Sequence, residues 1–96
     1  MPSYRLTRRA ESDLLDAFLF GLERFGEAQA QRYQLGFERC FGMLAENPGL
    51  GRPADIIAAG LRRHEHASRV VLYEPDANRV LIVAVVHGRS IRALDL

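Results

Sequence analysis

The stretch from Gly60 to Arg89 constrains the fold more than any other part of the chain. It contains three short runs, residues 61–66, 69–74 and 79–87, separated by turn-forming residues. The last run, RVLIVAVVH, is the most apolar in the sequence, and its β-branched content and turn-bounded length favour a strand over a buried helix segment. We therefore expect a three-stranded antiparallel meander, with Val80–Val86 as its central strand, buried on both faces, and Pro75–Asn78 as the hairpin loop.

A short strand and a helix are expected before this meander. Residues 3–7 alternate between polar and apolar side chains, as a strand does, and Thr7 is a suitable N-cap for a following helix. The apolar residues that follow at helical spacing form one expected stripe: Leu14, Phe18, Leu22 and Phe25. Gly26 is a natural stop for this helix.

A second helix is expected from about Glu27 to Glu46, ended by Asn47-Pro48-Gly49. Its apolar face consists of Ala30, Tyr33, Phe37, Phe41 and Leu44. Two helices joined at one glycine form an antiparallel hairpin. Residues 49–59 are expected to be a loop with one helical turn around 55–58, and they lack the pattern of a nucleotide-binding loop.

The first helix has more apolar surface than one face requires. Leu15, Leu19 and Phe20 lie off its main stripe. Either the helix is buried on two sides, or these residues form an exposed apolar strip that docks a partner.

The order of elements predicts an α+β fold of the form β-α-α-β-β-β. The helical hairpin packs on an antiparallel sheet, and the first strand joins that sheet beside a later one. A chain of 96 residues with ordinary globular composition is expected to form a single domain over 1–96. The sequence shows no run apolar enough to span a bilayer and no signal-peptide pattern, so we expect a cytoplasmic protein.

Charge and cysteine content narrow the function classes. The formal net charge is only +1, although residues 49–96 carry seven Arg against five acids. This suggests a site for an anion or an acidic partner, but the excess is too small for strong nonspecific DNA binding. The single Cys40 excludes an internal disulfide and a cysteine-based metal site, and we expect it to be buried on its helix.

Several segments together resemble one known family. They are Tyr4–Thr7 with the following Ala10 and Asp13, the Phe25-Gly26-Glu27 junction, residues 44–52, Gly60–Arg63, and the closing pair 70–73 and 82–89. In this order and spacing they resemble the ParE toxins of the RelE/ParE superfamily, the toxic halves of bacterial type II toxin–antitoxin operons. The resemblance covers nearly the whole chain.

The resemblance implies a partner and a target. It implies neutralisation by a ParD-like antitoxin in a hetero-oligomer, expected to be a heterotetramer that reaches operator DNA only through the antitoxin. The implied target of ParE members is DNA gyrase, whose poisoning blocks replication. Two alternatives stay open: a ribosome-dependent mRNA interferase of the RelE kind, and a toxin-like fold that has lost toxicity and acts only as an antitoxin-binding corepressor.

RNA cleavage would need phosphate-binding and proton-transferring side chains. Arg62, Arg63, Arg69 and Arg89 are candidates for the first role, and His64, His66 and His87 for the second. However, RelE-type enzymes resemble one another in a sheet face rich in Lys and Arg and in an aromatic residue or His near the C-terminal end. This chain has no Lys, and its last seven residues contain neither Tyr nor His. We therefore predict no catalytic residues and no cofactor.

The histidines also have plainer roles. His87 is expected to be a turn-anchoring hydrogen bonder in a His-Gly-Arg corner. His64 and His66 point to one side of their strand and Glu65 to the other, but with no third ligand nearby we expect solvated edge residues rather than a metal site.

Two sets of binding residues are predicted. The antitoxin-binding set is Leu15, Leu19, Phe20, Arg62, Arg63 and Arg69. For Arg62 and Arg63 the alternative is a salt bridge to Glu38 or Glu46. The target-binding set, which the resemblance places at the C-terminal end, is Arg89, Ile91, Arg92, Leu94 and Leu96.

Overall fold

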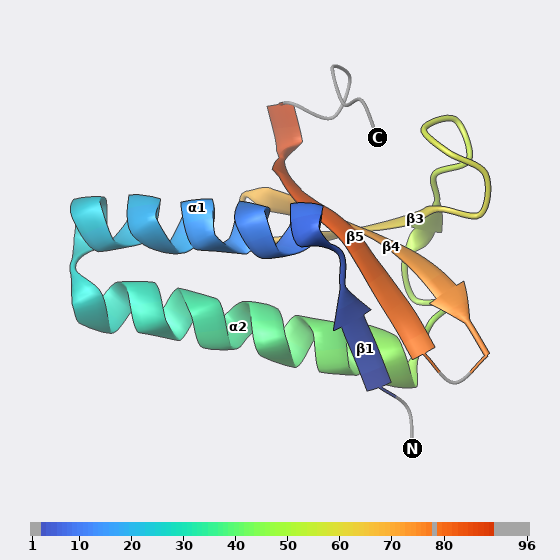
Figure 1. The fold of residues 1–96 in the computed structure, drawn as a ribbon, viewed down its shortest axis with the longest axis horizontal. Coiled ribbons are helices and arrows are strands. Elements are labelled where there is room, and N and C mark those ends of the chain that lie inside the picture. Colours follow the sequence, from blue (N-terminus) through green and yellow to red (C-terminus); the bar gives the residue numbers. More distant parts are fainter. Residues whose placement is uncertain (1–2, 78, 90–96) are drawn as a thin grey trace.

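The computed structural model describes residues 3–77 and 79–89. In chain order the elements are β1 (Ser3–Leu6), α1 (Arg8–Phe25), α2 (Glu27–Glu46), β2 (Arg52–Pro53), β3 (Arg62–His66), β4 (Arg69–Asp76) and β5 (Arg79–His87). Figure 1 shows the two helices as an antiparallel hairpin whose closed end projects beyond the strands. The predicted α+β order is confirmed, with one added strand, β2.

The sheet is mixed, not antiparallel as predicted. Its strands lie in the order β1-β5-β4-β3-β2. The pairs from β2 to β5 are antiparallel, but β1 runs parallel to β5, with Ser3 opposite Arg79. A parallel neighbour needs a long crossover, and the helical hairpin between β1 and the later strands supplies one. The prediction that Val80–Val86 is the central strand is wrong: β4, which pairs with β3 on one side and β5 on the other, is central both in the meander and in the five-stranded order.

The hairpin loop between β4 and β5 is shorter than predicted. Pro75 and Asp76 belong to β4, which leaves residues 77 and 78 as the connection. Ala77 takes a positive φ of 37°. The pairing of β3 with β4 ends at Tyr73, so Pro75 has a strand partner on the β5 side alone. A proline is tolerated at such an edge because its missing N–H would face no neighbouring strand.

The sheet buries apolar side chains on both faces. On the helix side, Val71 and Tyr73 of β4 pack with Val80 and Ile82 of β5 against Phe37 and Phe41 of α2. On the opposite face, Leu72 and Ala84 pack with Ala54 and Leu61 from the segment between β2 and β3. This alternation confirms the prediction that the strand over Val80–Val86 is buried on both faces, and β4 shares that property.

The buried stripe of α1 differs from the one predicted. The residues facing the core are Ala10, Leu14, Ala17 and Gly21, whereas Leu22 and Phe25 are exposed. Small residues let the helices approach closely, and a Cβ at Gly21 would lie 3.7 Å from that of Ala30 in α2. Leu22 and Phe25 belong to the last turn of α1, at the closed end of the hairpin, which projects beyond the strands (Figure 1).

Two polar residues fix α1 to the sheet. The Thr7 hydroxyl accepts a hydrogen bond from the Ala10 N–H, which confirms the predicted cap, and donates one to the carbonyl of Val83 at 2.7 Å. Asp13 accepts a hydrogen bond from the Val85 N–H at 2.9 Å. These contacts provide hydrogen-bond partners for backbone groups of β5 that lie beyond the end of β1.

Within the described residues, no helix is both long and apolar enough to cross a membrane.

Candidate functional site

The projecting part of the helical hairpin encloses a groove of about 450 Å³. We call it the hairpin groove. Its lining comes from both helices and from the turn between β3 and β4: Ala17, Phe20, Gly21, Phe25, Gln29, Ala30, Arg32, Tyr33, Ser68 and Arg69. Its size is within the range of sites that hold a ligand or a few side chains of a partner.

The groove walls are mainly apolar. Phe20 is 49% exposed and is held by the guanidinium of Arg24, which lies 4.9 Å from the centre of its ring. Tyr33 packs edge-on against the buried ring of Phe37, with 4.9 Å between the ring centres. Each aromatic side chain of the groove wall therefore has a favourable contact with a neighbouring residue.

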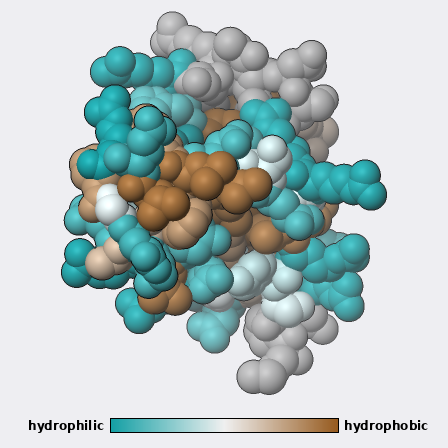
Figure 2. Space-filling model, turned by 60° about the vertical axis from the view of Figure 1, so that its left-hand side comes forward, coloured by the Kyte–Doolittle hydropathy of each residue, from teal (hydrophilic) through white to brown (hydrophobic). Residues whose placement is uncertain are grey.

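The outer surface of α1 carries a second apolar region. Leu15 and Leu19 are 57% and 49% exposed and lie four residues apart, so they share a helix face. Neither of them lines the groove, whereas Phe20 does. Figure 2, with the hairpin end brought forward, shows apolar side chains gathered in a patch bordered by hydrophilic ones. Leu15, Leu19 and Phe20 are therefore exposed rather than buried on a second side of α1, and the docking of a partner there stays a prediction.

The predicted antitoxin-binding residues thus fall in separate places. Phe20 and Arg69 line the same groove, and Leu15 and Leu19 lie on the outer face of α1. Arg62 and Arg63 lie on β3, outside the groove lining. Leu19 and Phe20 are adjacent in the chain and therefore point about 100° apart around α1, which places them on different surfaces.

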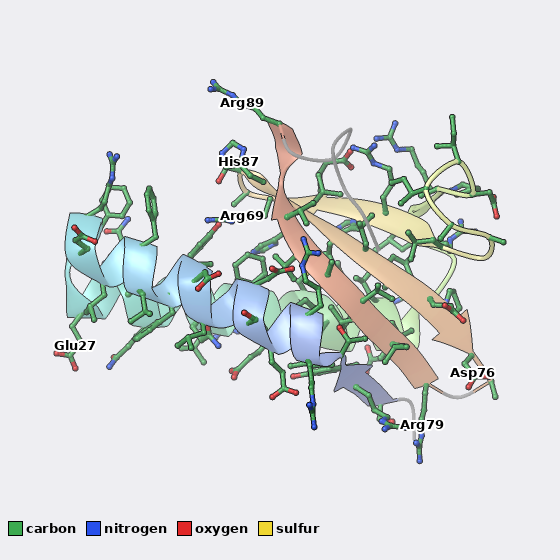
Figure 3. All side chains as sticks on the ribbon, turned by 45° about the horizontal axis from the view of Figure 1, so that its top comes forward. Glu27, Arg69, Asp76, Arg79, His87 and Arg89 are labelled. Carbon is green, nitrogen blue, oxygen red and sulfur yellow. The ribbon has the colours of Figure 1, made fainter. Side chains whose placement is uncertain are left out.

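A row of three basic side chains crosses the sheet beside the groove. Arg69 at the start of β4 is paired in register with His66 of β3 and with His87 of β5. Paired residues on neighbouring strands share a face, and this one is the helix side, because His66 contacts Phe37 of α2. In Figure 3, Arg69, His87 and Arg89 lie at one end of the sheet, and Asp76 and Arg79 at the other.

Arg69 is half-buried between two hollows. One is the hairpin groove, and the other, of about 180 Å³, is lined by Arg9, Asp13, Asp16, Arg69, Val85, Val86 and His87. The Nε atom of Arg69 is buried without a hydrogen-bond partner. Within residues 3–77 and 79–89 its guanidinium forms no ion pair.

Arg62 holds the loop before β2. Its guanidinium donates to the backbone carbonyls of Gly49 and Gly51. The hydroxyl of buried Tyr73 binds the same loop: it accepts from the Gly51 N–H and donates to the Pro48 carbonyl, both at 2.8 Å. The predicted alternative for Arg62, a salt bridge to Glu38 or Glu46, is wrong because the loop carbonyls lie within its reach.

Arg63 faces the other side of the sheet. Its terminal nitrogen pairs with Glu65 at 3.1 Å, and Glu65 also binds Arg52 of β2 at 2.6 Å, so the alternative of a helix partner is wrong for Arg63 too. Partial burial alone would raise the pKa of Glu65. A backbone hydrogen bond, the hydrogen bond from Arg52 and the charges of both arginines outweigh this effect and lower it.

His66 is not the solvated edge residue that was predicted. Its ring lies 5.0 Å from that of Phe37, and a Cβ at Gly36 would approach its Nε2 to 3.3 Å. The missing side chain at Gly36 therefore makes room for the imidazole against α2. Partial burial, and after it the nearby charge of His64, lowers the pKa of His66. His64 is half-buried as well.

The first of the predicted target-binding residues, Arg89, lies two residues after the end of β5. Arg89 is exposed, and its backbone N–H donates to Nδ1 of His87 at 3.3 Å, which confirms His87 as a turn-anchoring hydrogen bonder. Ile91, Arg92, Leu94 and Leu96 lie outside the described residues.

In the described part of the chain, no three His, Cys, Asp or Glu side chains lie close enough together to form a metal site. Cys40 is buried, and burial raises the pKa of its thiol.

Two features of the site were missed at the sequence level. One is Arg32, which lines the groove but carried no distinguishing signal in the sequence. The other is Asp13, which was noted only as part of the family resemblance but accepts a hydrogen bond from the Val85 N–H of β5. The sequence does not show which strand lies beside this part of α1, so the backbone partner of Asp13 in β5 could not be predicted.

Comparison with known proteins identifies the family. The family model of the ParE toxin of the type II toxin–antitoxin system, parDE, matches residues 4–92. A protein named Toxin ParE1 from Caulobacter vibrioides is 40% identical over 87 residues, covering 91% of this chain and 90% of its own. A Toxin ParE1 from Mycobacterium tuberculosis is 28% identical over 87 residues, covering 90% of this chain and 89% of its own.

Two solved structures share the fold. The chromosomal ParDE toxin–antitoxin system from P. aeruginosa gives a TM-score of 0.75 at 21% identity, covering 91% of this chain and 96% of that one. The RelBE2 toxin–antitoxin complex from Mycobacterium tuberculosis gives 0.59 at 24% identity, covering 91% and 99%. The likeness to these two supports the RelE/ParE fold, and the family match over residues 4–92 shows that this chain belongs to the ParE toxins of type II toxin–antitoxin systems.

Proposed function

We propose that this toxin acts in the cytoplasm by inhibiting DNA gyrase, and that a ParD-like antitoxin neutralises it by covering the hairpin groove and the outer face of α1. The observation that carries the proposal is the uncovered apolar surface of the projecting hairpin: Phe20 in the groove, and Leu15 and Leu19 outside it. An apolar surface of this kind on a small protein is a typical protein-binding site. The gyrase target is inferred from membership of the ParE family.

The antitoxin contact can be tested with matched substitutions. Leu15→Asp and Leu19→Asp should weaken antitoxin binding, because each places a charge in an apolar contact. Leu50→Asp is the control, since Leu50 is 51% exposed but stands before β2, away from α1. Isothermal titration calorimetry measures the affinity, and circular dichroism verifies that each variant is folded. Affinities equal to wild type in folded Leu15 and Leu19 variants would remove the outer face of α1 from the interface.

The target can be tested by induction of the toxin alone in a bacterial host. DNA and protein synthesis are followed in parallel by uptake of labelled precursors. An early fall in DNA synthesis with continuing translation is the expected result, and failure of purified gyrase to supercoil a relaxed plasmid in the presence of the toxin would agree with it. Arg89→Ala tests the predicted target-binding end, since loss of toxicity with unchanged antitoxin affinity would separate the two surfaces. No effect on growth would favour the corepressor interpretation.

An mRNA interferase is the second candidate, and one observation favours it. The row His66, Arg69 and His87 places two possible proton-transfer groups on either side of a cation. An early loss of protein synthesis, with cuts in translated message that disappear in His87→Ala, would support that activity over gyrase inhibition.

The assembly is proposed to be a heterotetramer of two toxins and two antitoxins, which reaches operator DNA only through the antitoxin. Light scattering on the purified complex would measure its mass directly. A mass that fits one toxin and one antitoxin would contradict this stoichiometry.

A further inference from the structure

The hairpin groove has a one-sided charge. Its described lining includes two arginines, Arg32 and Arg69, and no acidic residue. The remaining lining is apolar or uncharged, with Phe20, Ala30 and Tyr33 among it. A trough of this kind is complementary to a peptide segment that presents apolar and acidic side chains together.

Among the described residues, Arg69 has no partner of the kind that the two arginines of β3 have. The guanidinium of Arg62 is bound by loop carbonyls, and that of Arg63 is paired through its terminal nitrogen with Glu65, although the Nε atom of Arg63 is also buried without a partner in that part of the chain. Arg69 has a buried Nε without an acceptor, and the residues beside it on both strands are His66 and His87 rather than acids. A buried donor without an acceptor costs free energy, which is recovered when an acceptor arrives.

The nearby acids do not fill this role. Asp13 and Asp16 line the smaller hollow beside Arg69. Asp13 already accepts hydrogen bonds from Arg9 and from the Val85 N–H. Neither aspartate forms an ion pair with Arg69 in the described part of the chain.

We propose that Arg69 is the anion-binding residue of the hairpin groove, and that the antitoxin segment which fills the groove brings a carboxylate to it. This inference rests on the proposed function, because the occupant is the antitoxin. The carboxylate accepts hydrogen bonds from the guanidinium, and an apolar side chain of the same segment packs against Phe20 and Tyr33. A nucleic-acid phosphate fits less well, because these walls offer apolar contact in place of the further cations that a polyanion would need.

The first experiment compares Arg69→Met with Arg79→Met by calorimetric titration of the antitoxin. Methionine keeps most of the aliphatic stem and removes the charge. Arg79 is an exposed arginine at the start of β5, whereas Arg69 lies beside His87 at the end of that strand (Figure 3). Arg79→Met therefore removes an arginine charge far from the groove and serves as the control. We expect Arg69→Met to weaken binding by at least roughly tenfold and Arg79→Met to change it by less than about twofold.

The free toxin supplies a second readout. If Arg69 serves the partner rather than the fold, Arg69→Met has an unfolding midpoint equal to or higher than wild type, because an unpaired buried donor is removed. A clearly lower midpoint in the free chain would make Arg69 a structural residue and overturn the proposal.

The carboxylate can be located by a double-mutant cycle. Each acidic residue of the toxin-binding segment of the antitoxin is neutralised to Gln or Asn in turn. One of these changes should weaken binding to wild type as much as Arg69→Met does, and cause little further loss in the Arg69→Met background.

The outcomes separate this inference from the proposed function. Wild-type antitoxin affinity in Arg69→Met overturns the inference and leaves antitoxin binding intact, whereas an antitoxin that fails to bind the wild-type chain removes both. Unchanged antitoxin affinity combined with lost binding of a fluorescent single-stranded RNA oligonucleotide would assign Arg69 to phosphate instead.

Discussion

The hydroxyl of Tyr73 offers the sharpest test of how the sheet fixes its surrounding loops. Tyr73 is fully buried in the central strand β4. Its oxygen accepts a hydrogen bond from the Gly51 N–H and donates one to the Pro48 carbonyl, each at 2.8 Å. Tyr73→Phe removes this one atom and keeps the ring, so it isolates the two hydrogen bonds from the packing of the aromatic side chain.

The expected loss of stability follows from what is left unpaired. Each hydrogen bond has a net value of about 1 kcal/mol, and a buried donor without a partner costs about 1–3 kcal/mol. Gly51 is buried, and Pro48 is half-buried, so water can replace only part of the loss. We therefore expect Tyr73→Phe to lower the free energy of unfolding by about 2–3 kcal/mol.

Urea unfolding followed by the helical circular dichroism signal measures this change. For a chain of this size the thermal midpoint should fall by on the order of 10–20 °C. Tyr33→Phe is the matched control, because Tyr33 is half-buried and its hydroxyl forms no hydrogen bond within the described residues. That variant should change the free energy of unfolding by less than about 0.5 kcal/mol. If Tyr73→Phe were no more destabilising than Tyr33→Phe, the argument that Tyr73 fixes the loop would be refuted.

Three further predictions test other parts of the structure. Gly51→Ala should destabilise the chain strongly, because the new Cβ would lie 2.5 Å from the Arg63 carbonyl oxygen, and a thermal melt equal to wild type would contradict this close approach. Gly42→Ala, within α2, places its new Cβ in open space and should instead stabilise the chain by about 0.5–1 kcal/mol in urea unfolding. The pKa of His66 is lowered from its ordinary 6.5, so the unfolded chain binds this proton more tightly, and stability is intact above about pH 6.5 and falls as the pH drops toward the folded-state pKa. The thermal midpoint should therefore fall less in His66→Gln than in wild type between about pH 7.5 and 5, and equal slopes would show that His66 is not the responsible group.

The local sequence was sufficient for most of the secondary structure. Thr7, Gly26 and the Asn47-Pro48-Gly49 stop bound the helices as predicted, because capping and helix termination depend on residues within a turn of the boundary. The β-branched run of β5 was also recognisable, since period and composition are local properties.

The candidate site was less predictable. Phe20 and Arg69 were both named as binding residues, but the groove that joins them requires α1, α2 and the β3–β4 turn to be placed together. The helix partners proposed for Arg62 and Arg63 were wrong because nearby loop carbonyls and Glu65 lie closer to them than the helix acids do. Charge complementarity in a sequence does not say which partner is within reach.

The sequence by itself determined the two helices, the closing strands and the family to which the chain belongs. The helices and strands follow from caps, periodicity and turn residues that act over a few positions, whereas the family was recognised by the resemblance of several segments in their order along the chain. Only the tertiary structure decided that β1 lies parallel beside β5, that small residues of α1 face α2, and that His66, Arg69 and His87 form one row. These features depend on register and on contacts between residues far apart in the chain, and short-range patterns carry no information about either.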